Sequence, residues 1–113
     1  MLLPVVLPGL DLDWAVYDGP DALGPGPRGL LEPVGARLGR QAIGDADVVL
    51  APALAVDTAG RRLGQGGGCY DRALARVAAQ TPVLAVVFAE EVVPGPLPEE
   101  PHDRRVAGVV TAP

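Results

Sequence analysis

The sequence predicts an α/β fold built on a mostly parallel β-sheet. Three consecutive segments support this prediction: an apolar strand over 47–50, a segment of helical periodicity over 68–79, and a continuous apolar run over 83–88. The middle segment has apolar residues at the spacing of an amphipathic helix, and the last run is typical of a central parallel strand. A strand, a helix and a strand in this order form a βαβ unit, which implies parallel strands and a right-handed crossover.

The flanking segments predict shorter elements. Strands are expected over 2–7, over 12–17 (exposed) and over 106–111. Residues 18–29 are rich in Gly and Pro and predict a loop, whereas residues 30–43 are too weakly periodic to assign. Pro52 is expected to stop the strand at 47–50, because proline cannot donate to a sheet ladder.

Composition limits the possible functions. A chain of 113 residues predicts a single domain, 1–113, whose core must be built from Val, Leu and Ala because aromatic residues make up only 4%. The net charge of -5 argues against a nucleic-acid partner, which would require a clustered basic surface. One cysteine fits a reducing compartment, and Pro4 and Pro8 break the apolar start of the chain. We therefore expect a cytoplasmic protein with no signal peptide and no membrane partner.

The most informative segment is residues 51–72, which predicts a buried strand end, an Asp-x-x-Gly turn, a glycine-crowded loop and a helix start. This order places backbone N–H groups and a helix N-terminus together, as in many phosphate sites. Arg61 and Arg62 precede the glycines and offer bidentate donors for phosphate. The spacing matches neither a Walker A loop nor the Rossmann fingerprint, in which Cys69 would be glycine. On the glycines alone, a turn without a ligand remains an equal alternative.

Two side chains at the expected helix start allow more than one role. Asp71 either favours the helix dipole or holds a magnesium ion beside phosphates, because hard cations prefer carboxylate oxygen. Arg72 is either an exposed helix residue or the partner of Asp71. The residues themselves leave both questions open.

The pattern Asp57-x-x-Gly60-x-Arg62-Leu63-Gly64-x-Gly66-Gly67-Gly68-x-Tyr70-Asp71-Arg72 resembles the signature of the 5-formyltetrahydrofolate cyclo-ligase family, also called 5,10-methenyltetrahydrofolate synthetases. Three further segments resemble family motifs: Leu3-Pro4, the Gly-x-x-Glu-Pro turn at 29–33, and the C-terminal stretch at 97–111. The resemblance covers nearly the whole chain.

The resemblance implies a three-layer α/β/α sandwich with a mostly parallel sheet, similar to the ribose-5-phosphate isomerase and CoA-transferase group. It also implies a ligase that uses ATP and Mg²⁺ to convert 5-formyltetrahydrofolate to 5,10-methenyltetrahydrofolate, ADP and phosphate. The ATP phosphates would be bound by Arg62, Leu63, Gly64, Gln65, Gly66, Gly67, Gly68, Cys69 and Tyr70. Residues 65–69 would also approach the formyl group, and Asp71 and Asp103 would hold Mg²⁺. The resemblance assigns no single catalytic residue.

The chain departs from the family pattern in several places. The family's N-terminal part, which supplies basic residues for ATP and side chains for the folate pocket, has no counterpart, so we expect an N-terminally truncated domain with an exposed apolar face that favours self-association. Cys69 replaces a tyrosine, and Ala107 replaces an aspartate. His102 is expected to be a loop residue beside Asp103, and Trp14 is expected to pack in the core. Two alternatives stay open: a non-catalytic nucleotide- or folate-binding module that needs the missing segment, and a structural domain whose glycines only form turns.

Overall fold

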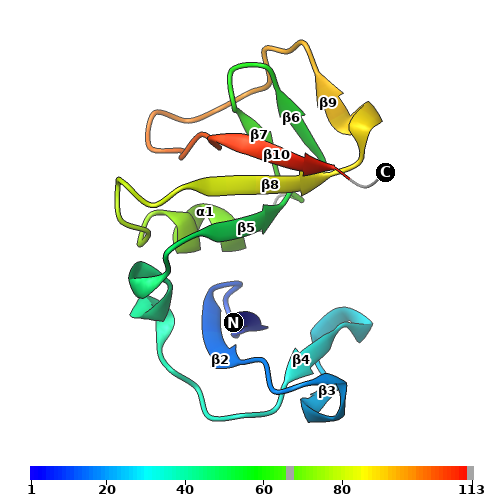
Figure 1. The fold of residues 1–113 in the computed structure, drawn as a ribbon, viewed down its shortest axis with the longest axis vertical. Helices are drawn as coiled ribbons and strands as arrows, with labels where there is room; N and C mark the ends of the chain where they lie inside the picture. Colours follow the sequence, from blue (N-terminus) through cyan, green and yellow to red (C-terminus); the bar gives the residue numbers. More distant parts are fainter. Residues whose placement is uncertain (66–67, 112–113) are drawn as a thin grey trace.

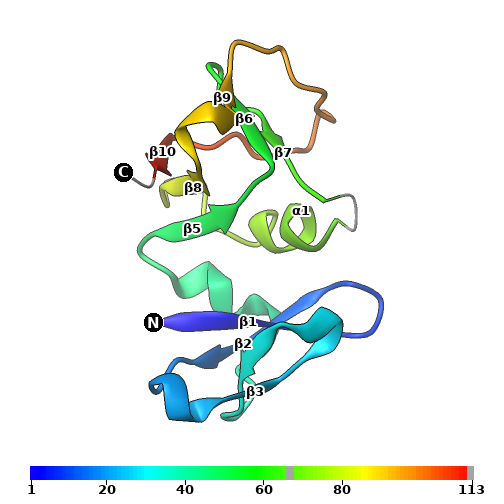
Figure 2. The same ribbon diagram turned by 90° about the vertical axis from the view of Figure 1, so that its right-hand side faces the viewer.

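The computed structural model describes residues 1–65 and 68–111. Two antiparallel hairpins form one end of the molecule, and a parallel sheet and a smaller mixed sheet form the other end (Figure 1). Helix α1 lies between the parallel sheet and the hairpins (Figure 2). The strands are β1 (Leu2–Val6), β2 (Leu12–Val16), β3 (Leu23–Pro25), β4 (Leu31–Pro33), β5 (Val49–Pro52), β6 (Ala55–Asp57), β7 (Arg62–Leu63), β8 (Val83–Val87), β9 (Val92–Val93) and β10 (Gly108–Thr111). The helical elements are α1 (Cys69–Leu74) and the 3₁₀ turns η1 (Pro20–Ala22), η2 (Pro27–Gly29), η3 (Arg40–Asp45) and η4 (Ala89–Glu91).

The βαβ unit is confirmed as β5, α1 and β8. The sheet has the order β10-β8-β5, and both pairings are parallel, with Ala51 and Val109 opposite Ala85. The continuous apolar run therefore forms the central strand, as expected. Strand β5 continues two residues beyond the predicted end and stops at Pro52, which an edge strand tolerates although proline lacks an N–H donor. The predicted α/β class with a mostly parallel sheet is confirmed.

Helix α1 is shorter than the periodicity predicts. It ends at Leu74, and the next bonds run from Arg76 N to the Ala73 carbonyl and from Val77 N to the Leu74 carbonyl. These are bonds to the third preceding residue, which tighten the chain into a turn. The apolar spacing still identifies the inward face correctly, because Leu74 and Val77 are both buried.

Strand β2 is buried, which corrects the expectation of an exposed strand. Leu12, Trp14 and Ala15 are at most 6% exposed, because η3 and α1 both pack against this strand. Trp14 joins one continuous core cluster that extends through β5, α1 and β8, as expected for a packing residue. The sequence around β2 does not reveal its burial, because η3 and α1, which cover it, come much later in the chain.

The segments 18–29 and 30–43 hold regular structure that composition did not reveal. Strands β3 and β4 pair as an antiparallel hairpin, with Leu23 opposite Pro33, and η1, η2 and η3 surround them. The hairpin is only three residues deep on each side. Such short elements leave no periodic signal, and the Gly and Pro content then predicts a loop.

The Asp-x-x-Gly turn is confirmed between β6 and β7. Gly60 N donates to the Asp57 carbonyl over 3.0 Å, and Gly60 adopts a φ of 88°, which favours glycine. A Cβ at this position would also collide with the Val106 carbonyl oxygen. The turn is thus fixed against a later segment, and β6 pairs with β9 in parallel on its other side.

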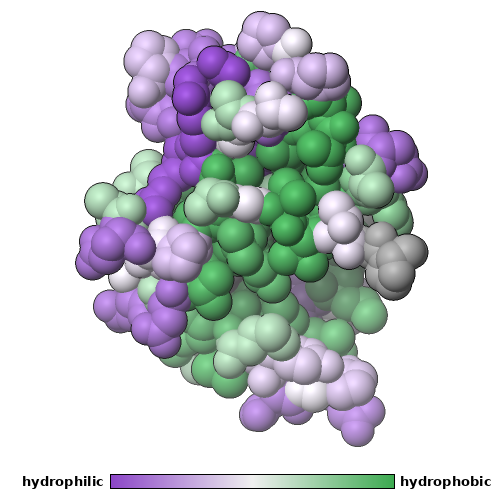
Figure 3. All heavy atoms as spheres, turned by 45° about the horizontal axis from the view of Figure 1, so that its top comes forward, coloured by the Kyte–Doolittle hydropathy of each residue, from purple (hydrophilic) through white to green (hydrophobic). Residues whose placement is uncertain are grey.

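The outer face of the parallel sheet is apolar and exposed. Leu50, Val86 and Val110 are 58%, 46% and 43% exposed, and the register places Val110 beside Val86. Phe88 follows β8 and is 60% exposed. Figure 3 shows apolar side chains gathered over the centre of one face of the molecule. No helix within 1–65 and 68–111 is long and apolar enough to cross a membrane.

Candidate functional site

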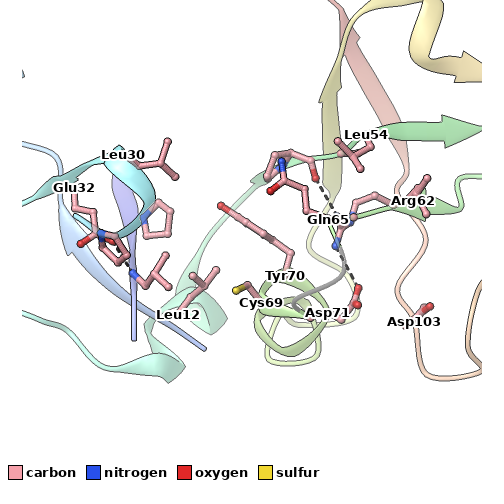
Figure 4. Close-up of a pocket in the computed structure, with 18 of the residues that line it drawn as sticks. Leu12, Leu30, Glu32, Leu54, Arg62, Gln65, Cys69, Tyr70, Asp71 and Asp103 are labelled. Atoms are coloured by element: carbon pink, nitrogen blue, oxygen red, sulfur yellow. Dashed lines mark hydrogen bonds and ion pairs between the residues drawn. The ribbon is translucent and has the colours of Figure 1, made fainter. Parts of the chain in front are cut away.

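A cavity of about 550 Å³ lies between the N-terminal hairpins and the segment around the glycine loop (Figure 4). One wall comes from the hairpins and is mostly apolar: Pro4, Val6, Leu12, Pro27, Leu30, Leu31 and Glu32. The opposite wall comes from β5, β7, α1 and the loop after β9: Pro52, Ala53, Leu54, Arg62, Leu63, Gly64, Gln65, Gly68, Cys69, Tyr70, Asp71, Pro98 and Asp103. Segments far apart in the chain therefore meet at one concave site, the usual shape of a small-molecule site.

Most predicted site residues lie on this second wall. Arg62, Leu63, Gly64, Gln65, Gly68, Cys69, Tyr70, Asp71 and Asp103 all line the cavity. Gly66 and Gly67 lie outside the described residues. Gly68 precedes α1 with a φ of 75°, a left-handed conformation that glycine adopts without strain. The order strand, glycine loop and helix thus brings the predicted residues to one place.

Arg62 lies at the centre of the polar wall. Its Nη2 is 3.2 Å from Asp71 Oδ1, and its Nη1 donates to the Pro52 carbonyl over 3.1 Å. The guanidinium also lies 5.8 Å from the centre of the Tyr70 ring. The Arg62 side chain is only 6% exposed, whereas that of Asp71 is 52% exposed. Arg62 is therefore a nearly buried cation whose carboxylate partner faces the cavity.

Arg61 does not line the cavity, which corrects the expectation that both arginines face phosphate. Its Nη1 lies 3.1 Å from Asp57 Oδ2 and its Nε lies 3.2 Å from Glu99. Arg61 lies just before β7, and its ion pairs with Asp57 and Glu99 hold it away from the cavity, whereas Arg62, the first residue of β7, lines the cavity. Burial raises the pKa of Asp57, but hydrogen bonds from the amides of Leu97, Arg61 and Ala59 and from the Arg61 side chain outweigh it. The pKa of Asp57 therefore lies well below its ordinary value, and the carboxylate stays charged.

Tyr70 and Cys69 face the hairpin wall (Figure 4). Burial raises the pKa of the Tyr70 hydroxyl, although the charge of Arg62 opposes this effect. Tyr70 is therefore a neutral aromatic surface at physiological pH. Cys69 is a free thiol on the same turn of α1, and it leaves more room there than an aromatic residue would.

Asp71 and Asp103 line the same cavity from α1 and from the C-terminal loop. One oxygen of each is engaged: Asp71 Oδ1 with Arg62, and Asp103 Oδ2 with the Glu100 amide over 2.8 Å. The described residues contain no group of three or more His, Cys, Asp and Glu side chains placed to hold a metal. Two carboxylates fit Mg²⁺, which commonly takes one or two protein carboxylates and completes its shell with water and substrate phosphates.

His102 and Arg72 lie next to Asp103 and Asp71 in the sequence. His102 is 78% exposed and its Nε2 lies 3.8 Å from Asp103 Oδ1, so it is a loop residue beside Asp103, as expected. Arg72 donates from Nη1 to the Leu10 carbonyl over 3.0 Å. Arg72 is an exposed residue of α1, and Asp71 pairs with Arg62. The magnesium role of Asp71 stays a prediction.

The hairpin wall is the part that sequence reasoning did not place. In the sequence, residues 29–33 stand out only as a motif, whereas in the structure Leu30, Leu31 and Glu32 form the far side of the cavity. Glu32 Oε2 accepts a hydrogen bond from Val6 N over 2.7 Å, which ties β4 to β1. Only the tertiary contact between the two hairpins reveals this wall. The cavity thus has a charged end suited to phosphate and a cation, and an apolar end suited to a flat ring.

Comparisons with known proteins show the family of the chain. A family model described as the 5-formyltetrahydrofolate cyclo-ligase family matches residues 1–112. A protein of Mycolicibacterium smegmatis named 5-formyltetrahydrofolate cyclo-ligase is 46% identical over 102 residues, which cover 90% of this chain and 52% of that protein. The fold and the composite cavity define an α/β protein with a candidate phosphate-binding loop.

Two solved structures agree with the fold. The NMR structure of Aquifex aeolicus 5,10-methenyltetrahydrofolate synthetase matches with a TM-score of 0.75 and 34% identity, over 97% of this chain and 54% of that one. A 5,10-methenyltetrahydrofolate synthetase from Mycoplasma pneumoniae shares the fold with a TM-score of 0.67 and 18% identity, over 96% of this chain and 53% of that one. The chain belongs to the 5-formyltetrahydrofolate cyclo-ligase family. It spans about half the length of these relatives.

Proposed function

We propose that this chain carries a shared ATP and folate site for the conversion of 5-formyltetrahydrofolate to 5,10-methenyltetrahydrofolate. One observation supports this most directly: a single cavity joins the Arg62–Asp71 pair and the glycine-loop residues to an apolar wall. In the proposed reaction the γ-phosphoryl group passes from ATP to the formyl oxygen, N10 attacks the formyl carbon, and phosphate leaves. The products are 5,10-methenyltetrahydrofolate, ADP and phosphate.

The described residues divide this work between the two ends of the cavity. Arg62 and the backbone of Gly64 and Gly68 would bind the phosphates, because charge-assisted hydrogen bonds stabilise phosphoryl oxygens. The apolar hairpin wall and Tyr70 would enclose the pterin and exclude water. Most of the catalysis would then come from positioning and charge neutralisation.

Mg²⁺ would be held by Asp71 and Asp103, and when bound it neutralises charge on the phosphates. The two residues fit this role because they line the same cavity and each has one oxygen already oriented by a hydrogen bond or ion pair. Arg62 would move its interaction from Asp71 to a phosphate when the nucleotide binds.

We also propose that residues 1–113 act as one domain located in the cytoplasm. The core cluster is continuous through β2, η3, β5, β6, α1 and β8, so the β1–β2 hairpin and the sheets share one apolar interior. A single free thiol fits a reducing compartment.

A second candidate function is a binding module that needs a further segment for turnover. Arg62 is the only cation among the described residues that line the cavity, although a triphosphate carries several negative charges. The chain also spans about half of its relatives. Both observations favour a chain that binds its ligands but requires additional basic side chains to catalyse their reaction.

The decisive assay follows formation of 5,10-methenyltetrahydrofolate by its absorbance, with the purified chain, ATP, Mg²⁺ and 5-formyltetrahydrofolate. ATP-dependent turnover supports the enzyme. Binding of both ligands without turnover supports the binding module. Absence of both turnover and binding contradicts both candidates.

A further inference from the structure

Asp103 lies in a long connection that has no regular structure of its own. Between β9, which ends at Val93, and β10, which begins at Gly108, the described chain forms only turns and extended segments. The position of Asp103 at the cavity must therefore come from side-chain and amide contacts of this segment, which include the bond from the Glu100 amide to Asp103 Oδ2 over 2.8 Å. Such a segment stays in one conformation only where side chains or amides anchor it.

The adjacent residue, Arg104, provides the strongest of these anchors. Its Nη1 donates to the carbonyls of Val77 and Ala78 over 3.0 and 2.9 Å. Its Nη2 donates to the carbonyls of Ala79 and Thr81. A planar guanidinium can satisfy several carbonyls at once.

Those four carbonyls belong to the turn that follows α1, and α1 begins at the cavity with Cys69, Tyr70 and Asp71. Arg104 thus connects the loop that bears Asp103 to the helical segment that bears Asp71. The two candidate magnesium ligands are held in a common frame by one side chain that lies outside the cavity lining.

The upstream half of the same loop has its own anchor. Leu97 N donates to Asp57 Oδ2 over 2.9 Å, and Glu99 pairs with Arg61 at 3.2 Å and with Arg105 at 2.7 Å. These contacts tie residues 97–99 to the β6–β7 turn.

Downstream, Val106 N donates to the Gly60 carbonyl and Ala107 N donates to the Val83 carbonyl, each over 2.8 Å. Among the loop anchors that the structure describes, those of Arg104 reach the turn that follows α1.

We propose that Arg104 is a positioning residue that sets the placement of Asp103 relative to Asp71 and so assembles the metal site. This inference rests on the proposed function, because it requires Asp71 and Asp103 to share an ion. Neither the resemblance nor the cavity lining points to Arg104. Its role follows from the bonds that it makes to the backbone behind α1.

The test uses Mn²⁺ in place of Mg²⁺, together with a non-hydrolysable ATP analogue and the full chain. Paramagnetic broadening of amide NMR signals reports whether residues 71 and 103 both lie near the ion, and a Mn²⁺ titration gives the affinity. Arg104→Met removes the bonds, and Arg104→Lys keeps the charge but not the planar fork. Arg37→Met is the matched control, because Arg37 also donates to backbone carbonyls, those of Pro33 and Gly35, in another part of the molecule.

In the wild type, signals of both Asp71 and Asp103 should broaden. In Arg104→Met the broadening of the Asp103 signal relative to that of the Asp71 signal should fall below its wild-type value, and Mn²⁺ affinity should fall roughly tenfold, as when an outer-shell partner is lost. The Mn²⁺ affinity of Arg104→Lys should lie between those of the wild type and Arg104→Met. Arg37→Met should match the wild type in both affinity and broadening.

Two other results separate the possible failures. If Arg104→Met keeps the wild-type ratio of broadening at Asp103 and Asp71 and keeps its Mn²⁺ affinity, even with a lower melting temperature, Arg104 is only structural and the inference is wrong. If the wild type broadens neither signal, the metal role in the proposed function fails, and the inference fails with it.

Discussion

Arg62 and Asp71 form an ion pair at 3.2 Å in the wall of the cavity, between a guanidinium that is 6% exposed and a carboxylate that is 52% exposed. The pair joins the one cation of the described lining to the first turn of α1. An incoming phosphate competes with Asp71 for Arg62, and an incoming cation competes with Arg62 for Asp71. Binding of the nucleotide therefore frees Asp71 for the metal, and binding of the metal frees Arg62 for the phosphate. We expect each ligand to raise the affinity for the other.

The first prediction concerns Arg62. Replacing it with methionine should weaken binding of ATP with Mg²⁺ by at least about tenfold, because a charge-assisted hydrogen bond to phosphate contributes about 1.5–3 kcal/mol. Isothermal titration calorimetry measures this affinity. Arg37→Met should bind like the wild type, and an unchanged affinity in Arg62→Met would exclude Arg62 from the phosphate site.

The second prediction is that the effect of Asp71→Asn on ATP affinity depends on whether Mg²⁺ is present. With Mg²⁺ present, Asp71→Asn should lower ATP affinity, roughly tenfold, because the ion loses a charged ligand. Without metal, the same variant should bind ATP as well as the wild type or better, because Arg62 is released from its partner. Equal effects in both conditions would show that Asp71 acts only on the stability of the helix start.

The third prediction concerns Cys69, which lines the cavity beside Tyr70. Cys69→Tyr should place a second aromatic ring against the apolar wall and tighten binding of 5-formyltetrahydrofolate several-fold, because ring stacking adds to apolar burial. Fluorescence or calorimetric titration compares it with Cys69→Ser, which adds no ring. Weaker folate binding in the tyrosine variant would mean that the space beside Tyr70 is already required by the ligand.

The fourth prediction concerns stability in acid. Asp11 accepts two hydrogen bonds from Arg76, each 2.7 Å long, which join the β1–β2 turn to the segment after α1. The bonds from Arg76 hold the pKa of Asp11 well below its ordinary value, with smaller lowering effects from the Leu12 amide and the charges of Arg76 and Arg40, against the raising effect of burial.

A carboxylate with a lowered folded-state pKa stabilises the fold above its unfolded pKa, near 3.9, and this contribution is lost as the pH falls through the folded pKa. Asp11→Asn should therefore lower the unfolding free energy by about 1.5–3 kcal/mol at neutral pH and flatten its decrease below about pH 4. Chemical denaturation at pH 7 and pH 3 measures both effects. Asp18→Asn, at an exposed loop carboxylate, is the control; an equal loss of stability at both pH values would contradict the role of the ion pair.

The fifth prediction concerns the apolar face formed by Leu50, Val86, Phe88 and Val110. Parallel sheets are normally covered on both faces, so this chain should self-associate at high concentration. Val86→Glu, on the central strand, should shift the population toward monomer in analytical ultracentrifugation. Val34→Glu is the matched control, since Val34 is 63% exposed and belongs to the loop after β4. A wild-type chain that stays monomeric would show that the face needs no cover.

Sequence patterns located the parts of the fold that depend on local chemistry. The apolar run of β8, the spacing of Leu74 and Val77, and the Asp57 turn are each specified by residues close in the chain, and the structure confirms them. The burial of β2 was not predictable, because the elements that cover it lie more than twenty residues later. The β3–β4 hairpin was not predictable for another reason: three-residue strands produce no periodic signal.

The candidate site also has one part that local sequence patterns predict and one part that depends on contacts between distant segments. The glycine signature placed Arg62, Cys69 and Tyr70 near Asp71, because one turn and one helix start carry them all. The hairpin wall and the anchoring by Arg104 depend on contacts between distant segments, and no local pattern encodes them. Arg61 shows the limit most clearly: its neighbour Arg62 lines the cavity, whereas ion pairs with Asp57 and the distant Glu99 hold Arg61 elsewhere.

The most direct test of the central claim, one cavity for both ATP and folate, is a pair of NMR titrations of the chain. ATP with Mg²⁺ should shift the amide signals of Gly64, Gly68 and Asp71, and 5-formyltetrahydrofolate should shift those of Leu12, Leu30 and Glu32, with Tyr70 responding to both. Absence of shifts at Gly64 and Gly68 with ATP would mean that the glycines only form turns. Folate shifts away from the hairpin wall would mean that the cavity is not a shared site.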